Sequence, residues 1–346
     1  MKTHVVIMAG GVGSRLFPLS TPEHPKQFCD LLECGKSMIR LTWERFLRVD
    51  PEAEFWVVTS AQYGHFVREQ LPSVPEDHIL LEPAARNTAP CIAYASAKIA
   101  ASCPSASAPS CHSANAPSLC HSDQAKRAEE SPSANAPSFC HSDQAKRAEE
   151  SPSANIVVTP ADAYVPDADA FAATLREALA FTASRDALVC VGIAPTRPET
   201  GYGYIHAPAA SHCHSERSEG ISSVVKVEAF KEKPDLATAE RYLATGGYFW
   251  NAGIFVWNVA TILAELRTYA PSICAVMDRL APSFGTPAEP AALSELFPTC
   301  EKISIDYAVM EKSAKVHMIP GRWAWSDLGS FAALAQITGK DYSSFQ

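Results

Sequence analysis

Short apolar runs alternate with amphipathic stretches along most of the chain. Runs of strand length lie at 5–8, 55–59, 78–81, 156–159, 187–193, 224–230, 248–257 and 316–319. Apolar residues at helical spacing occupy 38–46, 62–71, 89–100, 168–181, 236–244, 262–266 and 304–311. Strands that alternate with helices favour an α/β fold, in which a mixed, mostly parallel sheet has helices on both faces. Ligands of such sheets collect beyond the carboxyl ends of the strands.

This pattern breaks down between about 102 and 154, where Ser, Ala, Pro, Cys and His dominate. Residues 113–132 recur as 133–152 with one change, Leu119 to Phe139. Two polar copies lack the apolar face and the number of repeats of a solenoid. We therefore expect one domain, 1–338, interrupted by a disordered insert at about 102–154 and a smaller one at about 209–221, with a tail at 339–346.

Cysteine and histidine stand side by side three times in or beside these repeats, as Cys111-His112, Cys120-His121 and Cys140-His141. Thiolate and imidazole are zinc ligands, but structural zinc sites usually space their ligand pairs by about two to four residues. Adjacent ligands copied by duplication are weak support for a site, so we assign no metal to them.

A glycine-rich turn follows the first apolar run. Gly10, Gly11 and Gly13 stand where the chain must turn tightly, which lets backbone N–H groups approach a ligand. Such a turn suits phosphate. Arg15 adds a fixed positive charge with a fork of donors, and Lys26 adds a compact one. Together these residues predict a polyphosphate clamp.

Spacing decides among the phosphate motifs that these residues resemble. The dinucleotide fingerprint fails because Leu16 stands at its third glycine. The Gly35-Lys36-Ser37 segment looks like the end of a P-loop, but Asp30 replaces the required glycine. The remaining pattern, G-G-x-G-x-R-L-x-P-L-S followed by P-K-Q-F, resembles the signature of the sugar-nucleotide pyrophosphorylases, and most closely the mannose-1-phosphate guanylyltransferases.

Four later segments extend this resemblance: E-P-x-x-R-N-T-A-P from Glu82, P-T-R-P-E-T-G-Y-G-Y-I from Pro195, W-N-x-G-I-F from Trp250 and W-x-D-x-G-S from Trp325. The resemblance implies a Rossmann-like nucleotidyltransferase fold. It also implies transfer of a guanylyl group from GTP to α-D-mannose 1-phosphate, giving GDP-mannose and pyrophosphate, with Mg²⁺ as cofactor.

The residue roles that the resemblance implies fall into four groups. The catalytic group is Arg15, Lys26 and Asp162, and the metal ligands are Asp162 and Asp327. The nucleotide-binding group is Gly10, Gly11, Gly13, Ser14, Glu82, Arg86, Asn87 and Thr88. The sugar-phosphate group is Glu199, Gly203, Lys233 and Asn251.

Structural alternatives stay open for four residues in these groups. Helix capping alone could explain the Asn87-Thr88 pair, and Asp327 could be the N-cap of the last helix. Asn251 could be a core asparagine whose hydrogen bonds are satisfied within the protein.

The chain departs from the family pattern at Ala163, where histidine is usual, and at Phe331, where tryptophan is frequent. A degenerate homologue that binds a nucleotide sugar without catalysis is therefore an alternative. A pyrophosphorylase for another nucleotide or sugar 1-phosphate is a second one. Some relatives continue into an isomerase domain, and we do not expect that activity because the sequence ends at Gln346.

The composition of the chain further limits the classes of partner that we expect it to bind. The formal net charge of −9 gives no long-range attraction to nucleic acid or to an anionic membrane. No apolar run has the length of a membrane helix, and eleven cysteines without a spaced framework favour reduced thiols. We expect a cytoplasmic protein whose partners are GTP and mannose 1-phosphate, and whose assembly could be a homodimer.

Overall fold

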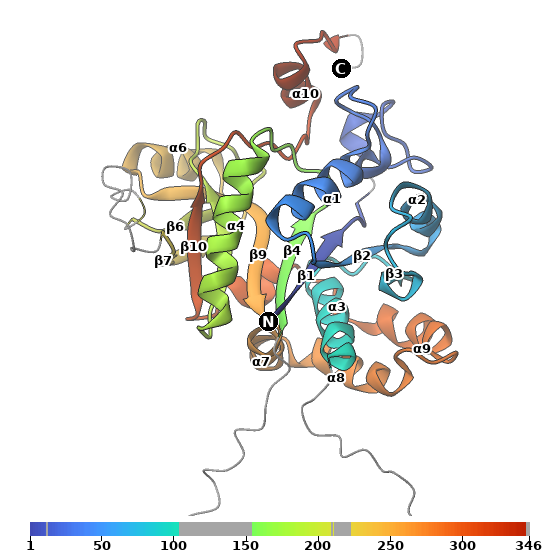
Figure 1. The fold of residues 1–346 in the computed structure, drawn as a ribbon. Helices are drawn as coiled ribbons and strands as arrows, with labels where there is room; N and C mark the ends of the chain where they lie inside the picture. The colour runs from blue at the N-terminus through green and yellow to red at the C-terminus, as the bar shows by residue number, and fades with distance from the viewer. Residues whose placement is uncertain (12, 104–153, 209, 211–222, 344–346) are drawn as a thin grey trace, which may run out of the picture. The chain divides into compact units, whose positions relative to one another are not determined.

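The computed structural model describes residues 1–11, 13–103, 154–208, 210 and 223–343 (Figure 1). Apart from a few residues at their edges, the segments expected to be disordered lie outside this part of the chain, as do the three Cys-His pairs. Their disorder therefore stays a prediction. The described residues belong to one compact unit, formed by Met1–Cys103 and Ser153–Gln346.

Most of the expected strands and helices are present, with ends that differ by a few residues. The strands are β1 (Lys2–Met8), β2 (Glu54–Ser60), β3 (Ile79–Glu82), β4 (Ala154–Pro160), β5 (Leu188–Ile193), β6 (Tyr204–His206), β7 (Val225–Lys226), β8 (Ala229–Lys231), β9 (Tyr248–Asn258) and β10 (Val316–Gly321). The α-helices are α1 (Met38–Val49), α2 (Gly64–Gln70), α3 (Thr88–Ser102), α4 (Ala168–Ala183), α6 (Leu236–Thr245), α7 (Val259–Tyr269), α8 (Pro271–Leu280), α9 (Glu289–Leu296) and α10 (Phe331–Thr338).

The strands form one mixed sheet in the order β3-β2-β1-β4-β9-β5-β10-β7, with β6 joining β9 to β8. The pairs β1·β2, β2·β3, β1·β4 and β5·β10 are parallel. Strand β9 runs antiparallel between β4 and β5. Because β9 is reversed, its first residues lie at the same sheet edge as the carboxyl ends of its two neighbours.

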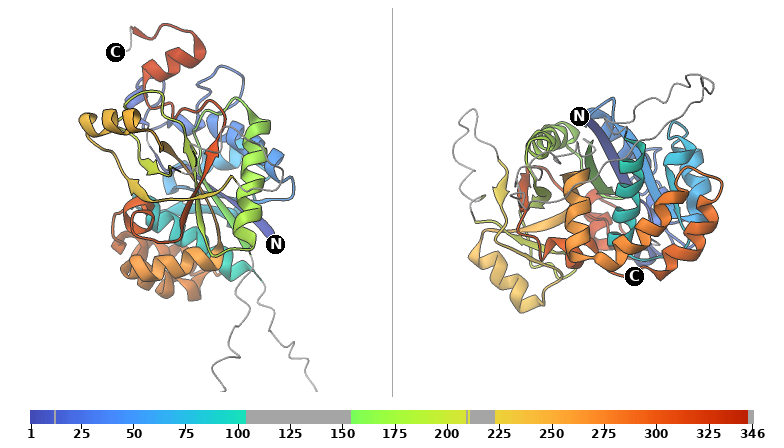
Figure 2. Two further views of the ribbon diagram at one scale, coloured as in Figure 1. Left: turned by 90° about the vertical axis from the view of Figure 1, so that its left-hand side faces the viewer. Right: turned by 90° about the horizontal axis from the view of Figure 1, so that it is seen from below.

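Alternate residues of the central strands face two separate hydrophobic cores. Val5 and Ile7 of β1 pack in the core that α1 and α4 cover. Val6 packs in the opposite core, against α3, α7, α8 and α9. Figures 1 and 2 show the two sets of helices on opposite faces of the sheet. This confirms the expected α/β fold with helices on both faces.

One predicted strand, 224–230, is wrong as a single element. The segment forms two short strands with different partners: β7 pairs with β10, and β8 pairs with β6. At the break, Val227 N donates to Val316 O (3.1 Å) and Glu228 N donates to His206 O (2.9 Å). The segment changes partners there, so a continuous strand is impossible.

The predicted helix at 304–311 is instead a π-helix, Asp306–Met310, with wider turns than an α-helix. Two α-helices, α8 and α9, were not expected from the sequence at all. Each has a proline in its first turn, at Pro271 and Pro290, where proline fits a helix start although it usually suggests a break.

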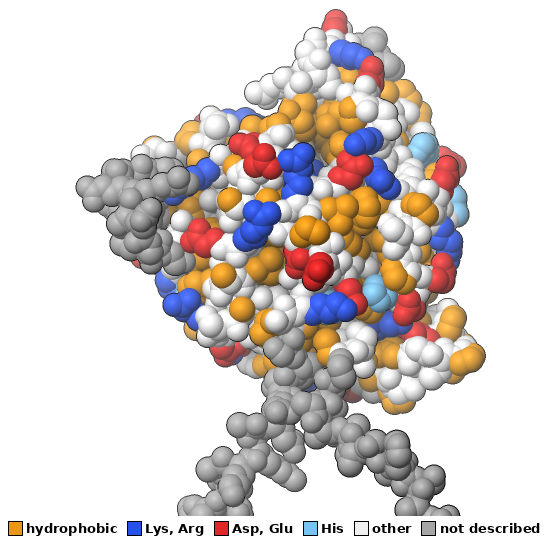
Figure 3. All heavy atoms as spheres, viewed as in Figure 1, with side chains coloured by type: hydrophobic (Ala, Val, Ile, Leu, Met, Phe, Trp, Pro, Cys, Tyr) orange, Lys and Arg blue, Asp and Glu red, His pale blue; other side chains and the backbone are white. Residues whose placement is uncertain are grey.

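Charged side chains of both signs are intermixed on the face that carries α1 and α4 (Figure 3). Arg48 Nη1 of α1, for example, lies 2.8 Å from Asp169 Oδ1 of α4. Among the helices of the described residues, none has the length and apolar character needed to cross a membrane.

Candidate active site

The order β2-β1-β4 creates a topological switch point, because the chain moves outward from β1 to β2 and β3 and then returns to β4 on the other side. The loops that follow β1 and β4 therefore open beside each other, as ligand crevices of open α/β sheets do. Ala161 N donates to Met8 O (3.0 Å), which ties the two loop starts together. The glycine turn and Asp162 are thus brought to one place.

The glycine turn has a fixed shape. Gly13 has φ +68°, and a Cβ there would lie 2.6 Å from Lys26 Cβ, so only glycine fits. Ser20 Oγ donates to Gly13 O (2.5 Å). The buried Gln27 side chain donates from Nε2 to Ala9 O (2.7 Å) and Gly11 O (2.9 Å). These bonds fix the carbonyl groups of the turn within the protein.

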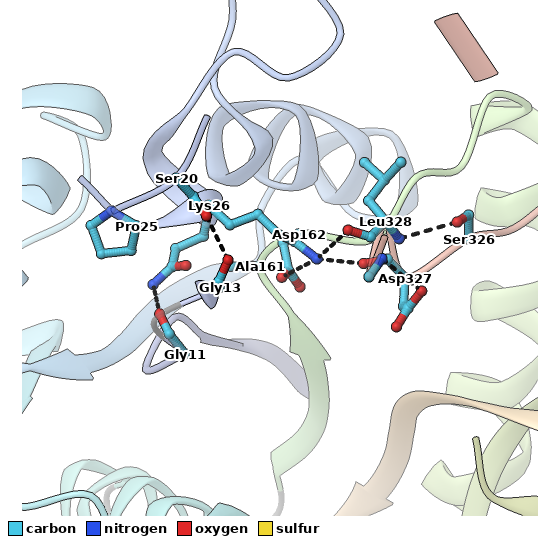
Figure 4. Close-up of polar contacts among 12 residues, drawn as sticks. Gly11, Gly13, Ser20, Pro25, Lys26, Ala161, Asp162, Ser326, Asp327 and Leu328 are labelled. Atoms are coloured by element: carbon cyan, nitrogen blue, oxygen red, sulfur yellow. Dashed lines mark hydrogen bonds and ion pairs between the residues drawn. The ribbon is translucent and has the colours of Figure 1, made fainter. Parts of the chain in front are cut away.

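Lys26 joins the glycine turn to two other loops (Figure 4). Its Nζ lies 2.8 Å from Asp162 Oδ2, donates to the main-chain oxygen of Asp327, and lies 3.3 Å from Leu328 O. The Lys26 side chain is only 8% exposed, whereas the Asp162 side chain is 31% exposed. The carboxylate therefore still faces solvent while the lysine is enclosed.

Arg15 and Ser14 lie on the exposed side of the same turn, in a short 3-10 helix, Ser14–Leu16. Within the part of the chain that the structure describes, the Arg15 guanidinium makes no ion pair. It is therefore available to a ligand at the mouth of the site.

Asp327 lies in the loop between β10 and α10. Its Oδ1 accepts hydrogen bonds from Tyr202 Oη (2.7 Å) and from Gly329 N (3.0 Å). Burial, and then the Asp327 carboxylate, raise the pKa of Tyr202, so its hydroxyl stays a donor. The alternative that Asp327 caps the last helix is wrong, because Ser330 is the N-cap and its Oγ accepts from Ala333 N (3.2 Å).

Glu82, the predicted nucleotide-binding residue at the end of β3, lies close to the glycine turn. A Cβ on Gly10 would lie 3.6 Å from Glu82 Oε2. Burial raises the pKa of Glu82 to about 7. Among the described residues, the buried atoms Glu82 Oε1 and Arg86 Nε have no hydrogen-bond partner. Unsatisfied buried polar atoms of this kind are suited to a ligand with complementary groups.

Asn87 and Thr88 also have structural roles. Asn87 is the N-cap of α3, with φ +69°, and its Oδ1 accepts from Thr88 N (2.8 Å). Thr88 Oγ1 accepts from Ile305 N (2.9 Å). The capping alternative is therefore correct for Asn87, and it leaves a binding role for either residue open.

A pocket of about 170 Å³ opens beside Asp162, and two of the four predicted sugar-phosphate residues, Gly203 and Asn251, line it. Its lining includes Asp162, Tyr202, Gly203, Glu232, Asn251, Asp306 and Asp327. Asn251 Oδ1 accepts from Gly253 N (3.0 Å), and Asn251 Nδ2 donates to Asp306 Oδ1 (3.0 Å). Asn251 is thus satisfied within the protein, as the alternative supposed, and yet it borders the pocket.

Two predicted sugar-phosphate residues lie outside this lining. The Glu199 carboxylate accepts from Gly201 N (3.0 Å) and from Arg197 Nη2 (3.1 Å). Lys233 is exposed, and its Nζ contacts Glu232. Both carry charge next to the pocket, on the loops that lead into β6 and α6.

Sequence reasoning missed Gln27, Tyr202, Glu232 and Asp306. Gln27 follows Lys26 directly, and Glu232 directly precedes Lys233, and both lysines were chosen as site residues. This adjacency was a usable signal. Asp306 had none, because its partner Asn251 lies 55 residues away in the chain.

The residues present fit a magnesium ion. Asp162 and Asp327 line one pocket, and Mg²⁺ is usually held by one or two carboxylates together with substrate phosphate and water. Over residues 1–11, 13–103, 154–208 and 223–343, no group of three or more His, Cys, Asp or Glu side chains could hold a metal. The protein's contribution would therefore be these two carboxylates, with substrate oxygens completing the shell.

Known proteins are similar to this chain in sequence, and a solved structure is similar to it in fold. The XanB xanthan biosynthesis protein of Xanthomonas campestris pv. campestris (strain B100) is 34% identical over 339 residues, which cover 97% of this chain and 59% of XanB. The mannose-1-phosphate guanylyltransferase of Escherichia coli (strain K12) is 34% identical over 342 residues, covering 97% of this chain and 60% of that protein. The chain thus spans about three fifths of the length of these relatives.

A solved structure from Thermus thermophilus, titled mannose-1-phosphate geranyltransferase, matches with a TM-score of 0.71 and 29% identity. The match covers 99% of this chain and 80% of that one. The family model described as nucleotidyl transferase matches residues 4–106 and 120–344. The fold, the glycine turn with its lysine and the extent of these matches together establish that the chain belongs to the nucleotidyl transferase family.

Proposed function

We propose that the protein transfers a guanylyl group from GTP to α-D-mannose 1-phosphate, with Mg²⁺ as cofactor. The observation that carries the proposal is the position of Lys26, which links the glycine turn to Asp162 and to the Asp327 loop at the switch point. The names of the relatives, which include mannose-1-phosphate guanylyltransferases, favour this nucleotide and this sugar.

The nucleotide would bind on the β1 and β3 side of the site. The backbone N–H groups of the glycine turn, Arg15 and Lys26 would hold the triphosphate, and Glu82 and Arg86 would contact the nucleoside. Their unpartnered buried atoms are the groups that guanine or ribose would satisfy.

The sugar phosphate would enter from the side of β6 and β9. The exposed Lys233 ammonium would pair with the phosphate, and Asn251 would lie along the hexose. Glycine at 203 lets the Glu232 carboxylate pack against the backbone beside Asn251, because a Cβ there would clash with Glu232 Oε2.

The reaction that this arrangement serves is an in-line displacement. A phosphate oxygen of mannose 1-phosphate attacks the α-phosphorus of GTP, and the bond from that phosphorus to the bridging oxygen breaks, so pyrophosphate leaves with its electrons. No protein nucleophile is needed, and catalysis rests on positioning and charge neutralisation. When bound to Asp162 and Asp327, Mg²⁺ would neutralise phosphate charge during this step.

We also propose a cytoplasmic location, and a homodimer stays an untested proposal. The alternatives are a pyrophosphorylase for another nucleotide or sugar 1-phosphate and a non-catalytic nucleotide-sugar-binding homologue. The buried Ala163, which replaces the usual histidine beside Asp162, is the feature that favours the last alternative.

A pyrophosphate-release assay tests the proposal. Purified protein is assayed with four nucleoside triphosphates, each with several sugar 1-phosphates, and the Asp162→Asn variant is the negative control. Release with GTP and mannose 1-phosphate above all other pairs supports the proposal. Preference for another pair moves the assignment to that pair, and no release above the Asp162→Asn background with any pair contradicts an enzymatic role.

A further inference from the structure

Asp306 has no role in the proposed function as stated, although it borders the sugar-phosphate pocket. Its carboxylate is half-buried and accepts a hydrogen bond from Asn251 Nδ2 (3.0 Å). The amide oxygen of Asn251 is engaged by Gly253 N (3.0 Å). Among the contacts of the described residues, these two bonds fix the amide plane and leave one Nδ2 hydrogen and one lone pair of Oδ1 for a ligand.

The backbone around Asp306 is held from the nucleotide side. Asp306 begins the π-helix Asp306–Met310, and Glu311 N donates to Asp306 O (2.9 Å). Ile305 N, one residue earlier, donates to Thr88 Oγ1 (2.9 Å), and Ala89 N donates to Ile303 O (3.1 Å). Short π-helical turns are frequent at functional sites. The first residues of α3, which belong to the proposed nucleotide side, therefore fix the position of the Asp306 backbone beside the pocket.

A second carboxylate lies close to Asp306. Burial, and then the nearby Glu232 carboxylate, raise the pKa of Asp306 to about 7. The Glu232 side chain is 8% exposed and fills the space beside Gly203. The carboxyl groups of Asp306 and Glu232 both line the pocket and offer several acceptor oxygens to a polyhydroxylated ligand. Asp306 also accepts the hydrogen bond that orients Asn251.

We propose that Asp306 is a positioning residue of this pocket: it orients the Asn251 amide toward the hexose, and the Thr88–Ile305 hydrogen bond links its position to the nucleotide side. The proposal deepens the proposed function and rests on it, because it takes the ligand of the pocket to be the hexose of a sugar nucleotide. It predicts that Asp306 affects binding of the sugar moiety and not binding of the nucleotide moiety.

The test compares the affinities of GDP-mannose and GDP by isothermal titration calorimetry on the full chain. The ratio of the two affinities measures the contribution of the sugar pocket. Asp306→Ala removes the acceptor for Asn251 and should reduce the GDP-mannose affinity about tenfold with GDP affinity unchanged. Asp306→Asn keeps an acceptor oxygen and should restore the ratio to within about twofold of wild type.

Glu301→Ala is the matched control, since Glu301 is an exposed carboxylate in the same segment. It should leave both affinities unchanged. The proposal is overturned if Asp306→Ala keeps the wild-type ratio, if it weakens GDP equally, or if Asp306→Asn is as impaired as Asp306→Ala. If Asp306→Ala does not fold, its melting transition is lost and the other variants decide. The proposal is then supported if Asp306→Asn keeps the wild-type ratio of GDP-mannose to GDP affinity and Asn251→Ala lowers it.

A wrong assignment of the proposed function can be distinguished from a wrong role for Asp306, because it changes which ligand the wild-type protein binds. Other sugar nucleotides, each paired with its own nucleoside diphosphate, are titrated into the wild-type protein first. If another pair binds better than GDP-mannose and GDP, the assigned substrate is wrong, and the same four variants are compared with that pair. If no sugar nucleotide binds, both proposals are contradicted.

Discussion

The Lys26 ammonium and the Asp162 carboxylate form an ion pair, with Nζ 2.8 Å from Oδ2. A lysine proposed to hold triphosphate and an aspartate proposed to hold metal thus neutralise each other in the absence of ligands. A phosphate group that binds Lys26 must share it with Asp162, and a cation at Asp162 competes with Lys26. Binding of nucleotide and of metal is therefore expected to be coupled at this pair.

Replacement of Lys26 tests the nucleotide side of this pair. Lys26→Met keeps the length of the side chain and removes its charge, so GTP affinity should fall at least about tenfold because a buried charge-assisted contact is worth about 1.5–3 kcal/mol. Calorimetric titration with GTP measures the change. Lys36→Met, at an exposed lysine paired with Glu44, is the control and should bind GTP normally. Equal GTP affinities in the two variants would remove Lys26 from the nucleotide site.

Replacement of the two aspartates tests the metal side. Asp162→Asn and Asp327→Asn should each lower turnover by about a hundredfold or more, because each removes a charge that would bind metal without changing packing. Pyrophosphate release measures turnover, and Mn²⁺ binding followed by electron paramagnetic resonance measures the metal site directly. The exposed Asp169→Asn is the control. Normal Mn²⁺ binding in either variant would contradict the assignment of that aspartate.

The shape of the glycine turn can be tested at two of its positions. Gly13→Ala places a Cβ 2.6 Å from Lys26 Cβ on a residue with φ +68°, so it should lower the melting temperature and weaken GTP binding. Gly11→Ala should leave the melting temperature unchanged, because a Cβ there meets no atom within 4 Å. Differential scanning calorimetry compares the two variants. Equal melting temperatures would show that the turn adapts to a side chain at Gly13.

A buried histidine should make folding stability depend on pH. Burial lowers the pKa of His4 to about 4, and the nearby Glu54 only partly opposes this effect. The unfolded chain binds a proton near pH 6.5 while the folded chain does not, so stability is full above about pH 6.5 and falls as the pH approaches 4. The loss that His4 contributes should reach about 3 kcal/mol at most.

Urea unfolding at several pH values measures this dependence. His4→Asn keeps an acceptor for Trp56 Nε1, which donates to His4 Nδ1 (3.1 Å) in the wild type, and should reduce the pH dependence. His65→Asn, at an exposed histidine, should keep it. The same slope in both variants would assign the pH dependence to other groups.

Sequence reasoning predicted the placement of candidate site residues best where these residues are neighbours in the chain. The positions of Gly13 and Lys26 were predictable because the turn, the arginine and the lysine follow one another within a short segment. The strand ends that deliver Asp162 and Asp327 were predictable because each aspartate follows shortly after a β-branched or apolar run.

Contacts between distant segments were not predictable in this way. Lys26 reaches the carbonyl oxygen of Asp327, 301 residues away, and no local pattern indicates that bond. Asp306 appears in the sequence as an ordinary polar residue at the start of an amphipathic stretch, and only the tertiary fold brings its π-helix to Asn251 of β9. Tyr202 lies between two glycines, and nothing in this local sequence indicates a role for it. Its hydrogen bond to Asp327 depends on the tertiary fold.

The long interruption of the fold begins and ends at an edge of the sheet away from the chemistry. Helix α3 starts at Thr88 beside the site and, with 15 residues, carries the chain about 22 Å away to Cys103. Strand β4 starts at Ala154, paired with Lys2, and delivers Asp162 only at its other end. Because both attachment points lie far from the proposed site, we expect gain or loss of a copy of the 20-residue repeat to leave catalysis unchanged.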